Sequence, residues 1–322
     1  MAKNGQKRFS LISEGTRKFF SAANEVEEFS LWDRIHGYVY IRWPYHYIGI
    51  GKGDHPIAKK LAPLIRLLFP PNESTSAPKP HSLNMATGTI ADGYHGKAMP
   101  LAAAKQLVTI NQPIKVPDLE QVIPYVRARS IILENPEHII ALDCPCRRYA
   151  ENPCYPMDVC LIVGEPFTSF VWQHHSEHSR WITQDEAVQI LEEEDARGHV
   201  HHAFFKDAML GRFYAICNCC ECCCGAMKAQ KNGNPMLTSS GYLAHIDAEL
   251  CIGCGTCVDY CQFGALSIGT EEAAVVDTNL CMGCAVCESK CDQGAISIHL
   301  APEKGVPLEI EKLFQAAVEE KG

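Results

Sequence analysis

Cysteine is the residue whose number and spacing point most directly to chemistry in this sequence. The 322-residue chain has 18 cysteines, and part of them form two copies of one motif. Residues 251–268 read CIGCGTCVDYCQFGALSI and residues 281–298 read CMGCAVCESKCDQGAISI, each with the spacing C-x2-C-x2-C-x3-C. Zinc sites usually use cysteine pairs with a longer spacer, whereas three cysteines in one tight loop suit three corners of a cubane cluster. The repeat therefore predicts two [4Fe-4S] clusters.

The fourth cysteine of each copy is expected to bind the cluster of the other copy. The two predicted ligand sets are Cys251, Cys254, Cys257 and Cys291, and Cys281, Cys284, Cys287 and Cys261. Over residues 246–300 the chain resembles the bacterial two-cluster ferredoxins, which implies a ferredoxin-like βαβ pseudo-repeat that carries electrons. The family usually has proline after the fourth cysteine, where this chain has Gln262 and Asp292. The resemblance therefore extends to the ligands but not to the redox potentials.

The remaining cysteines lie in the middle of the chain, in DCPCRRYAENPCYPMDVCLIVGE and ICNCCECCCG. Neighbouring side chains of an extended chain point to opposite sides, so Cys219 and Cys220, like Cys223 and Cys224, should serve different sites. We expect these groups together to hold one or two further iron–sulfur clusters; structural zinc and thiols buried as small hydrophobic side chains are the alternatives. The predicted metal-binding residues of this region are Cys144, Cys146, Cys154, Cys160, Cys217, Cys219, Cys220, Cys222, Cys223 and Cys224.

Charged and imidazole side chains near these cysteines are further candidates. Arg147 and Arg148 are placed to offset the negative charge of a thiolate-bound cluster. His201 and His202 lie nearest to the second cysteine group and are the better candidates to complete a metal site, although histidines more often have structural roles. Other histidines cluster at His174, His175 and His178.

The order CPCR, ICNCC and then the two-cluster motif also resembles a group of ferredoxin-containing proteins of anaerobic bacteria. The resemblance covers about residues 118–300. It implies electron transfer within a larger redox system and names no substrate.

Regular elements must bring the cysteines together. Apolar runs predict strands at 138–142, 159–163 and 211–216, which lead to or carry cysteines, and short strands at 265–268 and 295–298. Thr183 and Glu186 form a capping box ahead of a helix that Gly198 ends. Residues 118–134 have apolar side chains at helical spacing. The fold class is therefore α+β, with a central cysteine-rich α+β domain and a C-terminal ferredoxin-like module.

The rest of the chain has a different character. Residues 57–68 form an apolar stripe at helical spacing after an aromatic-rich stretch, which fits packing on its own domain, docking on a partner subunit or peripheral membrane contact. The predicted domains are an aromatic-rich N-terminal segment with this helix at 1–70, a linker or extended segment at 71–105, the cysteine-rich domain at 106–245, the ferredoxin module at 246–300 and a helical tail at 301–322.

Composition narrows the classes of function that the chain is expected to have. A net charge of −9 argues against nucleic-acid binding. No secretion signal and no apolar stretch long enough for a transmembrane helix are found, so we expect reduced thiols in the cytoplasm, with membrane association only through the N-terminal segment or a complex.

No nucleotide fingerprint, flavin motif or hydrolytic constellation occurs. We expect one-electron relay through several [4Fe-4S] clusters, as a subunit or partner of a larger anaerobic oxidoreductase. One alternative is a reductase whose central domain carries a catalytic iron–sulfur site fed by the ferredoxin module. Another is a central domain that binds zinc and has no redox role.

Overall fold

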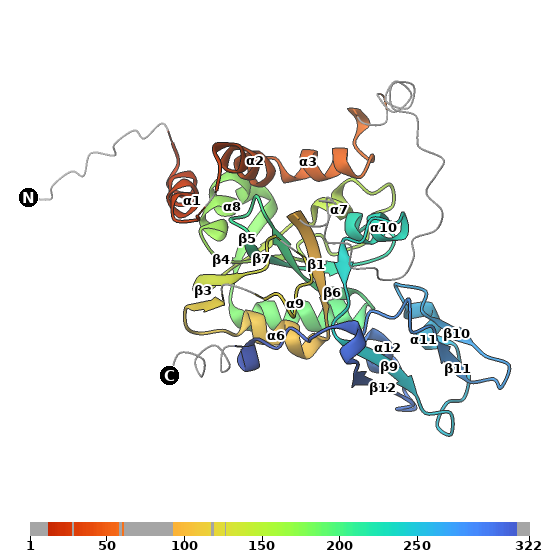
Figure 1. The fold of residues 1–322 in the computed structure, drawn as a ribbon. Coiled ribbons are helices and arrows are strands. Elements are labelled where there is room, and N and C mark those ends of the chain that lie inside the picture. The colour runs from red at the N-terminus through yellow and green to blue at the C-terminus, as the bar shows by residue number, and fades with distance from the viewer. Residues whose placement is uncertain are drawn as a thin grey trace, which may run out of the picture.

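A large antiparallel sheet organises the molecule. The computed structural model describes residues 12–27, 29–57, 60, 93–116, 119–125 and 127–313. The strand order is β2-β3-β4-β7-β6-β1-β8, with β5 beside β3; β1 and β8 run parallel, and the other pairs of described strands in this sheet run antiparallel (Figure 1). The strands are β1 (Tyr94–Met99), β2 (Ile114–Val116), β3 (Ile131–Leu142), β4 (Cys160–Glu165), β5 (Ser179–Ile182), β6 (Val200–Lys206), β7 (Arg212–Cys219) and β8 (Leu237–Thr238).

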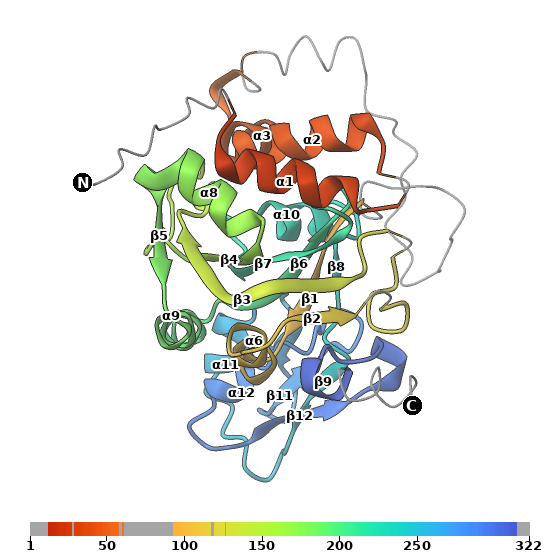
Figure 2. The ribbon, with the colours of Figure 1, turned by 90° about the vertical axis from the view of Figure 1, so that its left-hand side faces the viewer.

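Helices cover both faces of this sheet, as Figure 2 shows. Alternate side chains of a strand point to opposite faces, and in β3 Ile139 packs in one core while Ile140 packs in the other. Helices α6 (Leu101–Val108) and α9 (Gln184–Ala196) cover the first face. The second face is covered by α1 (Glu14–Asn24), α2 (Leu31–Arg42), α3 (Pro44–Gly51), α8 (Phe167–His175) and α10 (Gly225–Lys231), and the one-turn α7 (Pro145–Arg148) lies nearby.

The predicted strands that carry cysteines are confirmed as parts of β3, β4 and β7. The capping box of α9 is confirmed too: the Thr183 hydroxyl accepts from the Glu186 N–H at 3.1 Å, and the Glu186 carboxylate accepts from the Thr183 N–H at 2.9 Å. Gly198 follows this helix with φ +81°, and a Cβ there would lie 2.3 Å from the ring of Tyr260. The end of α9 therefore needs glycine both for its backbone and for close packing.

Two expectations for the central region are wrong. The segment 71–105, predicted as a linker or extended chain, contains the strand β1 and the start of the helix α6 in its described part. It was not recognised as part of the sheet because β1 is an inner strand whose buried polar residues, including Lys97, hide the strand pattern. Where a helix is predicted at 118–134, the described residues 119–125 and 127–134 form turns followed by the start of β3. In that turn the N–H groups of Val122 and Ile123 bond the carbonyl of Leu119, so the apolar side chains reach the core without a helix.

The N-terminal helices belong partly to the core of the central domain. Phe19 and Tyr40 are buried on the second face of the sheet, which agrees with packing on the chain's own domain. By contrast, Leu31 and Trp32 at the start of α2 are both 73% exposed. The apolar stripe at 57–68 lies mostly outside the described residues. None of the described helices is long and apolar enough to span a membrane.

The C-terminal unit lies beside the β1 side of the sheet (Figure 1). Its chain order is strand, helix, strand in each half, with β9 paired antiparallel to β12 and β10 to β11. The tail returns to the central domain, where Leu308 and Ile310 are buried, so the described part of the predicted tail docks. The elements are β9 (Tyr242–Ile246), α11 (Thr256–Tyr260), β10 (Leu266–Ile268), β11 (Ala274–Val276), α12 (Val286–Ser289) and β12 (Ile296–Leu300).

Candidate metal centres

The C-terminal unit contains two small cavities lined by cysteines. The outer cavity is lined by Cys251, Cys254, Cys257 and Cys291, and the inner cavity by Cys261, Cys281, Cys284 and Cys287. Each cavity thus receives three cysteines from one motif and the last cysteine of the other. The fold brings together the same two quartets that the motif spacing predicts.

Tight loops make this convergence possible. Gly253 and Gly283 occupy the same place in the two motifs and have φ +65° and +62°. A Cβ on Gly283 would lie 2.1 Å from the carbonyl oxygen of Tyr242, so no other residue fits there. Backbone N–H groups point at the sulfurs: Ala274 N–H donates to Cys251 Sγ at 3.3 Å. Such bonds stabilise thiolates and influence the potential of a bound cluster.

The two cavities differ in exposure. Cys254 is exposed, and hydrogen bonding from Thr256 lowers the pKa of its thiol. Cys284 and Cys287 face inward, and burial raises the pKa of Cys287 to about 12. The outer cavity therefore has a ligand position exposed to solvent, whereas the inner cavity faces the central domain.

The inner cavity packs directly against the central domain. Cys284 and Phe263 contact the buried core of that domain, and the ring of Phe263 lies 6.3 Å from the ring of His202. Gln262, which replaces the proline usual in two-cluster ferredoxins, accepts a hydrogen bond at 2.8 Å from the Glu221 N–H, between Cys220 and Cys222. The side chain that departs from the family pattern thus joins the module to the central cysteine run.

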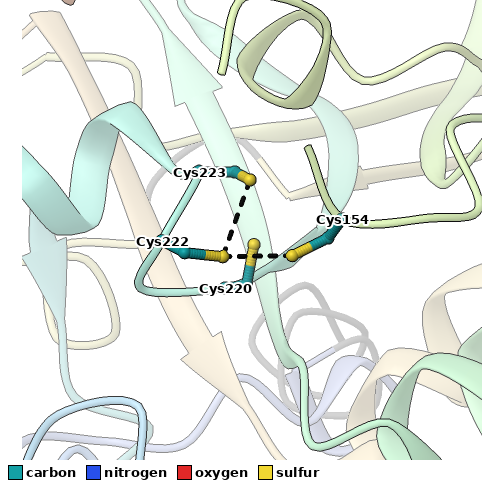
Figure 3. Close-up of side chains that lie close together, drawn as sticks. All are labelled: Cys154, Cys220, Cys222 and Cys223. Carbon is teal, nitrogen blue, oxygen red and sulfur yellow. Dashed lines mark hydrogen bonds between the residues drawn. The ribbon is translucent and has the colours of Figure 1, made fainter. Parts of the chain in front are cut away.

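The central cysteines divide into two groups. Four of them converge tightly, with all four sulfurs within 4.8 Å of one another (Figure 3). Cys222 Sγ lies 3.0 Å from Cys154 Sγ and 3.6 Å from Cys223 Sγ. We call Cys154, Cys220, Cys222 and Cys223 the loop quartet, because they lie on two loops outside the sheet.

The other six line a cavity under the N-terminal helices, and we call them the cavity sextet. Two strands present part of the set, since Cys160 on β4 pairs with Cys217 on β7 and their sulfurs are 3.9 Å apart. The sulfurs of Cys219 and Cys224, which belong to the same set, are 3.3 Å apart. The full sextet is Cys144, Cys146, Cys160, Cys217, Cys219 and Cys224; two loop-quartet residues, Cys220 and Cys223, reach the same cavity.

This division agrees with the alternation expected from the sequence. Cys219 and Cys224 belong to the sextet, whereas Cys220 and Cys223 belong to the loop quartet. Only tertiary structure reveals the opposite wall of the cavity, which Tyr40, Tyr94 and Tyr214 provide. The hydroxyls of Tyr40 and Tyr214 are 2.7 Å apart. Only Tyr40 belongs to the aromatic-rich N-terminus, whereas Tyr94 lies on β1 and Tyr214 on β7, so no single sequence signal pointed to this wall.

The electrostatics of the sextet favour thiolates at two positions. Hydrogen bonds with Cys144 and Cys224 lower the pKa of Cys146 well below its usual value. A hydrogen bond with Cys224, helped by nearby His202 and opposed by burial, lowers the pKa of Cys219 to about 6. Thiolates are the form that binds soft metal centres.

Arg147 reaches the cavity but is already paired. It is 1% exposed, donates to the Glu194 carboxylate at 2.5 Å and to the Asn218 carbonyl at 3.1 Å, and so balances a buried carboxylate. Arg148 is exposed and lies 3.4 Å from Asp143. Arg148 is therefore paired at the surface, and Glu194 takes up much of the charge of Arg147; that these arginines offset the charge of a cluster stays a prediction.

The histidines also differ in whether they lie near a candidate metal ligand. His201 Nδ1 bonds the Asn218 side chain at 2.6 Å, whereas His202 is fully buried beside Cys219 with no oxygen or nitrogen partner among the described residues. His202 is thus the histidine closest to a candidate ligand position. His174 bonds the start of α1, His175 bonds the Ile41 carbonyl at 2.8 Å, and His178 lies 3.3 Å from Asp143, so these three are structural.

The donor sets fit iron–sulfur chemistry. Each ferredoxin cavity offers four thiols, the number that a cubane needs, and the sextet offers more than four around one cavity, with thiolate character. Thiolates select iron–sulfur clusters or zinc over hard cations such as magnesium.

Comparison with known proteins agrees with this chemistry. Compared with curated protein sequences, the chain shows no significant match. Residues 244–267 match the Fer4 family, described as a 4Fe-4S binding domain, and this match includes Cys251, Cys254, Cys257 and Cys261. The chain therefore carries a 4Fe-4S binding domain near its C-terminus, within an α+β fold rich in cysteine.

Proposed function

We propose that this protein relays single electrons between a partner at the outer ferredoxin cavity and a centre held by the cavity sextet. The observation that carries the proposal is the contact between the inner ferredoxin cavity and the sextet, through Phe263 and His202. A [4Fe-4S] cluster supplies one-electron oxidation and reduction when bound. The chain's contribution is to place the cysteine sets in series.

The order of the sets follows from exposure. Cys254 of the outer quartet is exposed, and Ile252 beside it is 66% exposed, so a redox partner can dock there. The inner quartet lies between the outer quartet and the central domain. The sextet lies under α2 and α3, and four of its six cysteines are buried. Electrons therefore exchange with the partner at the outer quartet and reach the sextet last.

The wider setting is part of the same proposal. The protein works in the cytoplasm as a subunit or partner of a larger oxidoreductase in an anaerobic cell. The exposed Leu31 and Trp32 of α2 support contact with another subunit or a membrane surface at the N-terminal helices.

The first test is metal content after purification without oxygen. Two module clusters and one sextet cluster correspond to about twelve irons per chain, with matching sulfide. Cys144→Ser should remove about four irons and leave the module spectrum, whereas Cys284→Ser should remove about four from the module. About eight irons in the native protein would contradict the central centre, and near zero iron would contradict the whole relay.

The second test addresses the contact between module and central domain. Gln262→Pro restores the usual ferredoxin residue and removes the acceptor for the Glu221 N–H. We expect reduction of the central centre through the module to become several-fold slower in rapid-freeze EPR. Asp292→Pro is the matched control, at the same position of the other copy and on the outer quartet. Equal rates in the two variants would argue against electron transfer along this contact.

A second candidate function is a reductase that acts at the sextet. The observation that favours it is the wall of three tyrosines facing the thiols, which a simple relay does not require. A disulfide substrate would take two electrons, delivered singly, and two protons to give two thiols. A spectral change of the central centre on adding a small disulfide, absent in Cys144→Ser, would support this function.

A further inference from the structure

We infer that the loop quartet binds a single tetrahedral zinc ion that takes no part in electron transfer. The loop quartet shares no cysteine with the ferredoxin cavities or with the sextet, and two of its members, Cys220 and Cys223, also line the sextet cavity. It does not depend on the proposed relay, because it is built from Cys154, Cys220, Cys222 and Cys223 alone.

The spacing of the sulfurs carries the inference. Around one zinc ion the Zn–S distance is about 2.3 Å, so tetrahedral geometry places the four sulfurs about 3.8 Å apart. The loop quartet has all its sulfurs within 4.8 Å, with neighbouring sulfurs at 3.0 and 3.6 Å. A cubane holds its thiolates on four separate corners, directed outward, and therefore needs a wider set. The quartet matches one ion.

The ferredoxin cavities provide an internal comparison. Their eight cysteines all lie in the described part of the chain, and they form two quartets around cavities. Within the described residues, only the loop quartet is a group of three or more side chains that converges closely enough for one metal ion. The same structure therefore gives the cubane quartets and the loop quartet different spacings.

The backbone explains how three ligands can come from four residues. Residues 220–223 form a turn in which the N–H groups of Cys223 and Cys224 bond the Cys220 carbonyl at 3.3 and 2.9 Å. This turn directs the thiols of residues 220, 222 and 223 to one side, where Cys154 approaches from the loop after α7 (Figure 3). Four thiolates complete the tetrahedron and leave no open position, as in structural zinc sites.

The position of the turn indicates what the ion does. Glu221, at its centre, donates its N–H to Gln262 of the ferredoxin module. Cys219 and Cys224, which flank the turn, belong to the sextet. An ion that fixes this turn would hold both the docking contact and the edge of the sextet in place.

The test uses the full chain, expressed with iron supplied and no added zinc, and purified without oxygen. We expect about one zinc per chain, and the extended X-ray absorption fine structure of zinc should show four sulfur ligands at about 2.3 Å. This measurement needs no variant and is independent of folding effects. Zinc well below one per chain, or a shell with nitrogen or oxygen ligands, would overturn the assignment.

Variants then locate the ion. Cys222→Ser, at an exposed position, should lose the zinc and keep its iron and EPR spectrum. Cys144→Ser is the reciprocal control, which should keep the zinc. Loss of about four irons from Cys222→Ser would mean that the quartet holds a cubane. A single ferric ion bound by four thiolates at this site, detected by EPR, would contradict a redox-silent zinc site.

Discussion

The buried ion pair between Arg147 and Glu194 is the contact whose loss should be easiest to measure. The two side chains are 1% and 0% exposed, and their charged atoms are 2.5 Å apart. The pair links α7, which follows Cys144, to α9 and to the carbonyl of Asn218 on β7. Replacing Glu194 with glutamine leaves the guanidinium buried without its counter-charge.

Breaking such a pair typically costs about 3–5 kcal/mol, because one charge remains buried and unpaired. For a domain of this size, one kcal/mol shifts the melting midpoint by about 2–4 °C. We therefore expect Glu194→Gln to lower the midpoint by about 6–20 °C. The assay is circular dichroism during anaerobic heating of the intact protein at a fixed rate, at pH 7.

The neighbouring residue gives a matched control. Glu193 lies on the same helix but has a side chain 46% exposed, and its partner Arg197 is 3.4 Å away. Exposed pairs of this kind contribute about 0–1 kcal/mol, so Glu193→Gln should melt close to wild type. If Glu194→Gln melted within a few degrees of Glu193→Gln, the buried pair would not hold the cysteine loops in place.

The pH dependence has a definite sign. Burial by itself raises the pKa of Glu194, but the hydrogen bond with His199 and the charge of Arg147 outweigh it and keep the pKa below its usual value. The stabilisation is therefore complete above the unfolded pKa, about 4.3, and is lost as the pH falls through the folded value. The melting curves of wild type and Glu194→Gln should converge in acid.

Two further predictions concern the ferredoxin module and the tail. Gly283→Ala should abolish the EPR signal of the inner centre, because the new Cβ would lie 2.1 Å from the Tyr242 carbonyl oxygen at a φ of +62°. The control Gly294→Ala should keep this signal, because a Cβ there meets nothing within 4 Å. Burial lowers the pKa of Lys97 to about 7. Above that pH the unfolded chain binds more protons than the folded chain, so the free energy of unfolding should rise by about 2 kcal/mol between pH 7 and 9. Lys97→Met should lack this rise in midpoint, and an identical pH response would show that Lys97 is not buried as the structure places it.

Local sequence signals predicted the local elements well. The strand before Cys144 and the capping box of Thr183 and Glu186 depend on neighbouring residues, and both form as expected. The helix expected at 118–134 failed because the same apolar spacing also suits a tight turn packed on a core. Strand β1 was missed because its buried Lys97 finds a partner, the Val306 carbonyl at 2.8 Å, more than two hundred residues away.

What the sequence by itself determined is the ferredoxin chemistry, because C-x2-C-x2-C-x3-C sets the reach of each loop and glycines such as Gly253 permit its turns. It also determined that Cys219 and Cys220 face apart, since alternation is a property of the backbone. Only the tertiary structure decided which cysteines share a site, because Cys154 meets Cys222 across loops whose approach depends on the whole sheet. The tyrosine wall over the sextet likewise depends on tertiary structure, because Tyr40 comes from α2, Tyr94 from β1 and Tyr214 from β7, and packing in the shared core brings them together.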